Sequence, residues 1–290
     1  MIPAQFDFAT ATSVNEAVRY LEAHPGARVL AGGTGLIPAL SRSQLTASAL
    51  VDLQHIPGLA AVTPLDAGGV RIGALATLAE IAGNADIGTS YTVLAEAIAS
   101  AADPQIRNRA TIGGSLVLDR RGGDVAAALL ALAAVINVTG PTGDRAVAID
   151  TLLGGQEAVR LGPADIVTSI DLPSDAAGSA YEKFRNPAGG FAICGIAALL
   201  RLDRQRVVSQ CRVAVTGATP GVIRLPLLEA NLIGQAASVA TVSSEAFEAQ
   251  WAARTFSDDW PASADYRAHL VRVLTPRALR RAAERAGLNK

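Results

Sequence analysis

We predict an α+β fold from three features of the sequence. The first part of the chain alternates short apolar runs, typical of strands, with amphipathic stretches typical of helices. A small and polar segment over residues 173–178 then separates this part from a second one. Beyond that segment, apolar runs typical of an antiparallel sheet precede three helical stretches.

A capping box opens the first predicted helix. Ser13 stands three residues before Glu16, and apolar residues then recur at helical spacing as far as residue 24. Apolar runs over 28–31 and 49–53 predict strands on either side of a glycine-rich segment. The chain is therefore expected to open with alternating β and α elements.

The same alternation continues through the middle of the chain. Residues 70–74 predict a strand, and Thr77 with Glu80 predicts a second capping box. The alanine-rich stretch 94–102 predicts a helix that ends at Asp103 and Pro104. Further elements are expected as a helix over 125–134 capped by Asp124, and as strands over 135–138 and 166–172.

The second part predicts a sheet followed by helices. Strands over 180–184, 191–202 and 207–216 would form a three-stranded antiparallel sheet. The last of the three helices, over 264–286, carries six arginines among apolar residues. These arginines form either a solvated helix face or a docking surface.

Charge and cysteine usage exclude several classes of protein. The chain has 25 Lys and Arg against 26 Asp and Glu, so no net field would draw it to nucleic acid or to an acidic membrane. Its opening lacks the pattern of a secretion signal, and no apolar run is long enough to span a bilayer. Cys194 and Cys211 stand apart among apolar residues, as buried thiols do in a reducing compartment. We therefore expect a cytoplasmic protein with no membrane insertion.

The first candidate binding segment is Ala31-Gly-Gly-Thr-Gly35, which follows a predicted strand. Glycines let the backbone approach a ligand closely, and successive amides can hold an anion. The alternative is a tight turn that binds nothing. Position 38 is proline, so the third glycine of a dinucleotide-binding fingerprint is missing, and no Gly-Lys-Ser/Thr occurs for a nucleoside triphosphate.

The second candidate is the polar stretch from Asp103 to Ser115, which we expect to be a loop. It combines Arg107 and Arg109 with the run Thr-Ile-Gly-Gly-Ser that ends at Ser115. A pyrophosphate is bound by such a mixture of positive charge, hydroxyl groups and accessible amides. The alternative is an ordinary polar surface loop.

Other catalytic arrangements find no support. His24, His55 and His269 are isolated, with no carboxylate or cysteine at ligand spacing, so no zinc or iron site is expected. No Gly-x-Ser-x-Gly elbow occurs for a serine hydrolase. We therefore expect neither a catalytic residue nor a metal ligand in this chain.

Together these segments resemble the FAD-binding medium subunit of the molybdenum hydroxylases, the family of xanthine dehydrogenase and aerobic carbon monoxide dehydrogenase. The likeness covers nearly the whole chain. Its most specific part is Asp103-Pro-Gln-Ile-Arg-Asn-Arg109 followed by Thr111-Ile-Gly-Gly-Ser115. Tyr181-Glu-Lys-Phe184 is similar to the start of the family's C-terminal domain.

The resemblance implies a PCMH-type FAD-binding domain of two α/β subdomains plus a C-terminal α+β domain. The domains would cover 1–174, with subdomains at about 1–57 and 58–174, and 179–290. Matching positions imply contacts of both glycine segments with the cofactor, and further contacts from a carboxylate, an apolar residue, a lysine and an aromatic ring that covers the flavin. These positions are Gly32, Gly33, Thr34, Gly35, Leu36, Thr111, Ile112, Gly113, Gly114, Ser115, Asp124, Val167, Lys183 and Phe191.

The chain departs from the family pattern in three places. Residues 118–123 are Leu-Asp-Arg-Arg-Gly-Gly where His-Ala-Asp-Pro-Ala is usual, which adds two positive charges near the cofactor. Gly189-Gly190 stands where Gly-Asp is common, which removes a carboxylate near the flavin. Ser115 replaces a common asparagine conservatively.

The resemblance also implies a function. The chain would bind FAD and take electrons from two 2Fe–2S clusters on a small partner subunit, while a large subunit with a molybdenum pterin cofactor oxidises the substrate. A dimer of such heterotrimers is expected. Two separated cysteines cannot supply the four ligands of a cluster, which agrees with clusters on a partner. The alternatives are a flavin oxidase or reductase that acts alone, and a non-catalytic protein that delivers the cofactor; the substrate and the external electron acceptor are left open.

Overall fold

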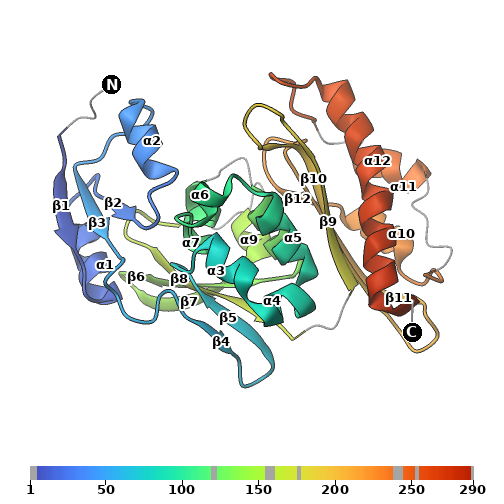
Figure 1. Cartoon of the computed structure of the whole chain (residues 1–290), viewed down its shortest axis with the longest axis horizontal. Coiled ribbons are helices and arrows are strands. Elements are labelled where there is room, and N and C mark those ends of the chain that lie inside the picture. Colours follow the sequence, from blue (N-terminus) through green and yellow to red (C-terminus); the bar gives the residue numbers. More distant parts are fainter. Residues whose placement is uncertain are drawn as a thin grey trace. The chain divides into compact units, whose positions relative to one another are not determined.

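The computed structural model describes residues 5–118, 123–153, 161–174, 178–237, 244–251 and 255–288. The chain divides into two compact units whose segments alternate along the sequence. The first unit contains residues 1–81, 104–118 and 134–174, and the second contains 82–103, 119–133 and 175–290. Figure 1 labels the elements of each unit.

A three-stranded parallel sheet opens the first unit. Its strands are β1 (Asp7–Thr10), β2 (Arg28–Leu30) and β3 (Ala49–Asp52), in the order β1-β3-β2. Helix α1 (Val14–Ala23) begins as predicted, because Glu16 N donates to Ser13 Oγ at 3.2 Å and the Glu16 carboxylate accepts from Thr12 N at 2.8 Å. The apolar face of α1 is buried, so the predicted alternation of β and α elements is confirmed.

A five-stranded antiparallel sheet completes the framework of the first unit, in the order β4-β5-β8-β6-β7. The predicted strands correspond to β5, β6 and β8, whereas β7 is polar and forms through its pairing with β6. The strands are β4 (Val62–Pro64), β5 (Gly69–Gly73), β6 (Val135–Gly140), β7 (Gly143–Ala148) and β8 (Ile166–Pro173). The helices are α2 (Leu36–Ser41), α3 (Leu78–Gly83), α6 (Pro104–Arg107), α7 (Ile112–Leu118) and α9 (Ile149–Leu153).

The second predicted capping box lies at the start of α3. Thr77 N donates to the Glu80 carboxylate at 2.8 Å, and Glu80 N donates to Thr77 Oγ1 at 3.2 Å. Each side chain thus satisfies an amide that the first turn of a helix leaves without an acceptor. This prediction is confirmed.

An antiparallel sheet forms the centre of the second unit, in the order β12-β11-β10-β9. The three predicted strands are present, and the two-residue strand β12 adds a fourth that is too short to carry a sequence pattern. The strands are β9 (Gly178–Arg185), β10 (Ala192–Leu202), β11 (Val208–Thr216) and β12 (Ile223–Arg224). Of the expected separator 173–178, residues 175–177 lie outside the described ranges.

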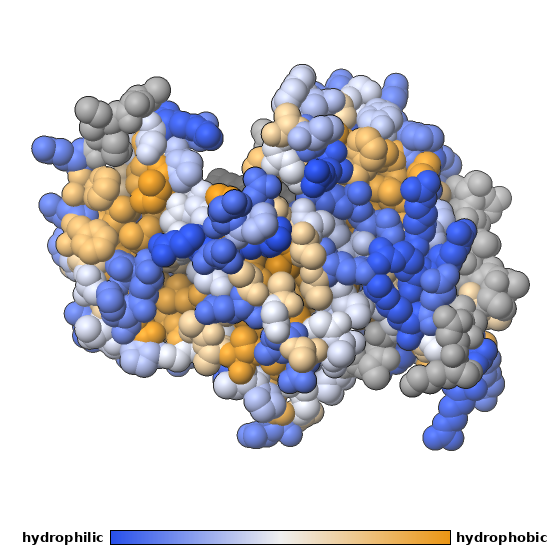
Figure 2. Space-filling model, in the orientation of Figure 1, coloured by the Kyte–Doolittle hydropathy of each residue, from blue (hydrophilic) through white to orange (hydrophobic). Residues whose placement is uncertain are grey.

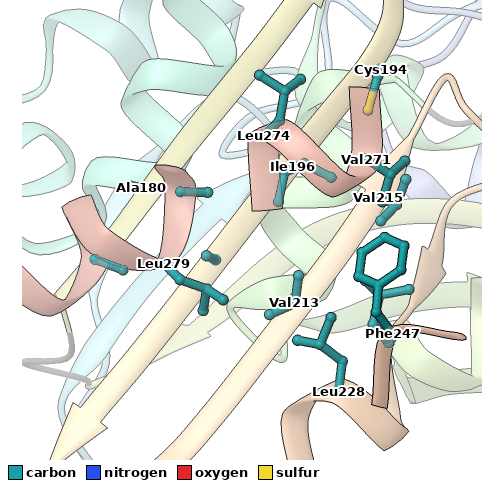
Figure 3. Close-up of a cluster of buried hydrophobic side chains, with 14 of the residues drawn as sticks. Ala180, Cys194, Ile196, Val213, Val215, Leu228, Phe247, Val271, Leu274 and Leu279 are labelled. Atoms are coloured by element: carbon teal, nitrogen blue, oxygen red, sulfur yellow. The ribbon is translucent and has the colours of Figure 1, made fainter. Parts of the chain in front are cut away.

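One face of this sheet is covered by the helices at the end of the chain. These are α10 (Pro226–Leu232), α11 (Ser244–Trp251) and α12 (Ala264–Ala283). Figure 3 shows side chains from the sheet, among them Ile196 and Val213, packed with Leu228, Phe247 and Leu274 from the helices. This cluster supplies an apolar core to the second unit.

The other face of the sheet packs against helices from the first half of the sequence, α5 (Thr92–Ser100) and α8 (Asp124–Ala131). Helix α4 (Ala85–Ser90) precedes α5. Successive side chains of β9 point to opposite faces, since Lys183 bonds to α5 and α8 whereas Glu182 bonds to Arg281 of α12. The sheet of the second unit therefore lies between two helical layers.

Most of the six arginines of the predicted helix 264–286, which spans α12 and the π-helical turn Glu284–Leu288, have specific partners. Arg267 is 4 % exposed and donates to the carbonyl oxygens of Ile193 at 3.0 Å and Gly217 at 2.6 Å. Ion pairs are formed by Arg267 with Asp259, Arg272 with Glu248, Arg281 with Glu96 and Glu182, and Arg285 with Glu96. Figure 2 shows hydrophilic side chains gathered over α12. A solvated face thus describes only part of this helix.

Among the helices that the structure describes, none is long and apolar enough to cross a membrane.

Candidate cofactor-binding site

The first glycine segment connects β2 to α2. Gly33 has a φ of 74°, in the left-handed region that glycine adopts without strain. Within the described part of the chain, the amides of residues 32–36 donate no hydrogen bond to another group. Consecutive amides without an internal acceptor are donors that a bound anion can use. The segment predicted from glycines alone therefore presents a row of amide donors without internal acceptors.

Gly32 lies against the backbone of the segment that precedes α7. A Cβ at this position would be 1.8 Å from the Arg109 carbonyl oxygen and 2.8 Å from the Arg109 carbonyl carbon. No side chain can be accommodated there without moving one of the two backbones. The glycine is therefore required by packing, and the contact joins the two candidate segments within the first unit.

The second glycine segment is not the loop that the sequence predicts. It forms the start of α7, where Gly114 N donates to Thr111 Oγ1 at 3.2 Å and Ser115 N donates to the Thr111 carbonyl oxygen at 3.0 Å. The Thr111 side chain thus caps a first helical turn, which polar composition and glycines did not indicate. Our expectation of a loop up to Ser115 was wrong for this reason.

The remaining amides of the second segment hold it to the end of β5. Ile112 N donates to Ala76 O at 3.0 Å, and Gly113 N donates to Ala74 O at 2.9 Å. A Cβ on Gly113 would lie 2.8 Å from Ala74 Cβ, so the glycine allows this close approach. Because these amides already have acceptors, the backbone amides without an acceptor in the two glycine segments lie mainly in residues 32–36.

A hollow of about 360 Å³ opens beside the first glycine segment. It is lined by residues 30–34, by Ile37 and Pro38 of α2, by Gln54, and by Ile106 and Arg109 around α6. Its size is in the range of small-molecule sites, which are mostly apolar with a few polar groups. Free amides, a positive side chain and an apolar hollow together fit the phosphate-bearing part of a flavin dinucleotide.

Asp124 and Lys183 lie together in the second unit. Lys183 Nζ donates to Asp124 Oδ2 at 2.7 Å and to Ser100 O at 2.9 Å, and the Tyr181 hydroxyl donates to Asp124 Oδ1. The lysine and aspartate side chains are only 5 % and 9 % exposed. Asp124 is the first residue of α8 and Gly123 is its N-cap, so the expected capping role of Asp124 is wrong.

Burial governs the protonation of this group. Burial raises the pKa of the Asp124 carboxyl, and the Lys183 ammonium acts against that rise. Burial, together with the neighbouring Asp124 charge, raises the pKa of Tyr181 well above its ordinary value, so the phenol keeps its proton. The Asp124 side chain is therefore bordered by the Lys183 side chain, which the salt bridge holds in place, and by the neutral phenol of Tyr181.

The two other predicted contacts differ in exposure. Val167 on β8 of the first unit is 8 % exposed and pairs with Val138 across the sheet. Phe191 of the second unit stands just before β10 and is 75 % exposed. A large aromatic ring left in water is available to cover a ligand. Of the altered stretch 118–123, residues 119–122 lie outside the described ranges.

No cluster of metal ligands occurs among the residues that the structure describes. Cys194 and Cys211 are free and buried. Burial raises the pKa of the Cys194 thiol to about 12 and also raises that of Cys211, so both stay protonated and unreactive. The expectation of buried structural thiols is confirmed.

Comparisons with known proteins cover nearly the whole chain. Residues 4–175 match the family described as FAD binding domain in molybdopterin dehydrogenase, and residues 179–282 match the CO dehydrogenase flavoprotein C-terminal domain. The 6-hydroxypseudooxynicotine dehydrogenase complex subunit alpha of Paenarthrobacter nicotinovorans is 33 % identical, over 99 % of this chain and 97 % of that protein. The carbon monoxide dehydrogenase medium chain of Hydrogenophaga pseudoflava is 31 % identical, over 96 % and 97 %.

Solved structures give the same result. Carbon monoxide dehydrogenase from Hydrogenophaga pseudoflava superimposes with a TM-score of 0.89 at 32 % identity, covering 98 % of this chain and 99 % of that one. Quinoline 2-oxidoreductase from Pseudomonas putida 86, at 23 % identity and a TM-score of 0.88 over 99 % of each chain, shares the fold. Fold and site define a flavoprotein subunit of an oxidoreductase. The chain belongs to the FAD-binding medium subunits of the molybdenum hydroxylase family, as the resemblance indicated.

The structure brings to these sites two residues that sequence reasoning missed and one that it named only for its charge. Gln54 and Arg109 line the hollow, and Tyr181 bonds to Asp124. Arg109 was noticed only as a charge in a polar stretch, and Tyr181 only as part of a family motif. For Gln54 no local signal existed, because its place beside Ala31 depends on the pairing of β2 with β3.

Proposed function

We propose that this chain carries electrons from 2Fe–2S clusters of a small partner subunit to an external acceptor by way of bound FAD. The observation that carries the proposal is the row of unbonded amides over 32–36 in a chain that matches a carbon monoxide dehydrogenase medium chain over 96 % of its length. The proposed assembly adds a large subunit with a molybdenum pterin cofactor and forms a dimer of heterotrimers in the cytoplasm. Relatives named as a medium chain or as a subunit of a complex support an assembly of several chains.

The proposed role of the first unit is to hold the pyrophosphate. Its amides at 32–36 would donate to phosphate oxygens, while α7 fixes the position of the facing segment through its bonds to Ala74 and Ala76. The Thr111 and Ser115 hydroxyls stand at the start of that helix. We propose the glycine segments and Val167 as contacts of this unit with the cofactor.

The proposed role of the second unit is to orient the redox-active ring. When bound, FAD supplies the exchange between one-electron and two-electron transfer. The salt bridge to Asp124 holds the Lys183 ammonium in a fixed place, and the exposed Phe191 ring can shield one side of a flat ligand from water. We propose Asp124, Lys183 and Phe191 as contacts, and we propose domains at 1–174 and 179–290.

Cluster chemistry is assigned to a partner because of the cysteines. A 2Fe–2S centre takes four ligands, and the chain has two cysteines, both buried and protonated. The substrate would be oxidised on the large molybdenum subunit, as the resemblance implies. This chain would then determine where the electrons leave the complex.

Purification of the chain with its natural partners tests the proposal. We expect a complex with bound FAD in its visible spectrum and with molybdenum and iron in metal analysis. A chain with glycine at position 32 replaced by alanine, expressed in the same way, provides the control for flavin held at the proposed cradle. A wild-type complex without flavin absorbance, or substrate turnover by the isolated chain, would contradict the proposal.

A further inference from the structure

We propose that Tyr181 is a positioning residue of the proposed flavin site: its hydroxyl fixes the Asp124 carboxylate, and the carboxylate in turn fixes the Lys183 ammonium beside the flavin. The inference rests on the proposed FAD contacts of Asp124 and Lys183. It adds a residue that acts only through these two side chains. The contacts that hold Tyr181 in this role all lie within the second unit.

The Asp124 carboxylate receives a side-chain donor on each of its oxygens. Lys183 Nζ donates to Oδ2 at 2.7 Å, and the Tyr181 hydroxyl donates to Oδ1. The Lys183 ammonium also donates to the carbonyl oxygen of Ser100, the last residue of α5, at 2.9 Å. A carboxylate held at both oxygens cannot rotate without breaking a charged hydrogen bond. The phenol thereby fixes the position of the oxygen that holds the ammonium.

Burial makes the phenol a lasting donor. Tyr181 is 4 % exposed, and burial raises its pKa well above the ordinary value, so it keeps its proton. Burial also raises the pKa of Asp124, whereas the Lys183 ammonium and the Tyr181 hydrogen bond act against that rise. The hydroxyl and the ammonium therefore act together to keep the negative charge on the carboxylate.

A glycine on the neighbouring strand makes room for the phenol. A Cβ on Gly195 of β10 would overlap the Tyr181 hydroxyl oxygen and would lie 2.9 Å from Tyr181 Cζ. It would also lie 2.8 Å from Cγ2 of Thr216 on β11. The hydroxyl can reach Asp124 only because position 195 has no side chain. This packing leaves the hydroxyl one place, against the Asp124 carboxylate.

The backbone of Tyr181 is also fixed, by side chains from two helices. β9 is an edge strand of its sheet, and the outward amides and carbonyls of such a strand have no neighbouring strand to bond. Tyr181 N donates to Glu96 Oε2 of α5 at 2.8 Å, and Tyr181 O accepts from Arg281 Nη1 of α12 at 3.1 Å. Glu96 and Arg281 form an ion pair with each other. Tyr181 is therefore held at both its ring and its backbone, which is what a positioning residue requires.

A redox titration of the full-length chain loaded with FAD tests this inference with Tyr181→Phe, which removes the hydroxyl and keeps the ring. Without the phenol, the Asp124 carboxylate has lost a donor and draws the ammonium closer to itself, away from the flavin. The negative charge of the reduced flavin is then less well stabilised. We expect reduced flavin to be bound about tenfold more weakly relative to oxidised flavin, which lowers the two-electron midpoint potential by about 30 mV.

Tyr266→Phe is the matched control, because Tyr266 lies on α12, which covers the other face of the sheet, and its ring contacts Phe184. Its midpoint potential should equal that of the wild type. In a chain that also carries Lys183→Met, Tyr181→Phe should add no further shift, since there is no ammonium to position. An additional shift there, or an unchanged potential in Tyr181→Phe alone, overturns the inference and leaves the proposed flavin function intact.

Urea unfolding of the same chains separates positioning from stability. A loss of stability in Tyr181→Phe at an unchanged potential would mean a purely structural role and would overturn the inference. A wild-type chain that takes up no FAD would instead contradict the proposed function, and with it the basis of this inference. The comparison of Tyr181→Phe with the wild type and with Tyr266→Phe decides the matter even if a chain with Lys183→Met does not fold.

Discussion

The carbonyl oxygen of Arg109 fills the space beside Gly32, where a Cβ would come within 1.8 Å of it. This contact ties the first glycine segment to the stretch that leads into α7. It joins two segments that are remote in sequence and that we propose as one cradle for the cofactor. The geometry of the cradle thus depends on a position that has no side chain.

Replacing that glycine tests the contact. Gly32→Ala should destabilise the chain by about 1–3 kcal/mol, as overpacking does, and should lower its FAD content by separating the two segments. Urea unfolding and the ratio of flavin to protein measure both effects. Gly88→Ala is the control, since a Cβ there meets nothing within 4 Å; inside α4 it should raise stability by about 0.5–1 kcal/mol and leave the flavin content unchanged. Normal flavin content in Gly32→Ala would count against the cradle.

The buried ion pair in the second unit predicts strong coupling. Lys183→Met leaves Asp124 buried without its cation and should cost about 3–5 kcal/mol of unfolding free energy. The double variant Lys183→Met, Asp124→Asn removes the uncompensated charge and should recover part of that loss. Unfolding midpoints of the wild type, both single variants and the double variant provide the cycle. If the changes in unfolding free energy of the two single variants add up to that of the double variant, the pair is not coupled.

Asp165 predicts a specific pH dependence. Its hydrogen bond from Arg145, at 3.0 Å, lowers the pKa of the carboxyl below its ordinary 3.8, with help from Gly162 N at 2.6 Å. A lowered pKa in the folded state means that the stabilisation is present above pH 3.8 and is lost as the pH falls below that value. Asp165→Asn should therefore be less stable than the wild type at neutral pH, and the gap should narrow in acid. A gap that is constant with pH in urea unfolding would refute this assignment.

Replacing Phe191 tests its contact with the cofactor separately from its effect on stability. Because its side chain is 75 % exposed, Phe191→Ala should change the unfolding free energy by less than about 0.5 kcal/mol. It should nevertheless alter the visible spectrum and the fluorescence of bound flavin, since the ring would no longer shield it. Trp260 is 81 % exposed in the same unit, and Trp260→Ala should leave both spectra unchanged. Identical spectra for the wild type and Phe191→Ala would remove this residue from the site.

Local chemistry made much of the fold predictable. The capping boxes at Ser13 and Thr77 involve residues three apart, so the sequence alone shows both partners. The strands of the second unit were also predictable, because each is a continuous apolar run that the sequence shows directly. What failed was the start of α7, where one hydroxyl, that of Thr111, turns a polar stretch into a helical turn.

The site was predictable only as separate parts. The glycine segments came from their composition and from the family pattern, whereas Asp124 and Lys183 came as cofactor contacts from the family pattern alone, which gave their positions without their partners. The contact of Gly32 with Arg109 and the salt bridge between Asp124 and Lys183 join residues far apart in sequence, so no local pattern could show them. For the same reason the sequence could not show that the amides of the second glycine segment have internal acceptors. Most amides without an acceptor therefore lie in the first glycine segment.

A mixing experiment tests whether this chain relays electrons from a partner's clusters, as we propose. The reduced iron–sulfur subunit, freed of reductant, is added without oxygen to the flavin-loaded chain while the flavin absorbance is followed. We expect rapid bleaching of the flavin, together with reoxidation of the clusters. Flavin that stays oxidised beside reduced clusters, in an assembled complex, would contradict it.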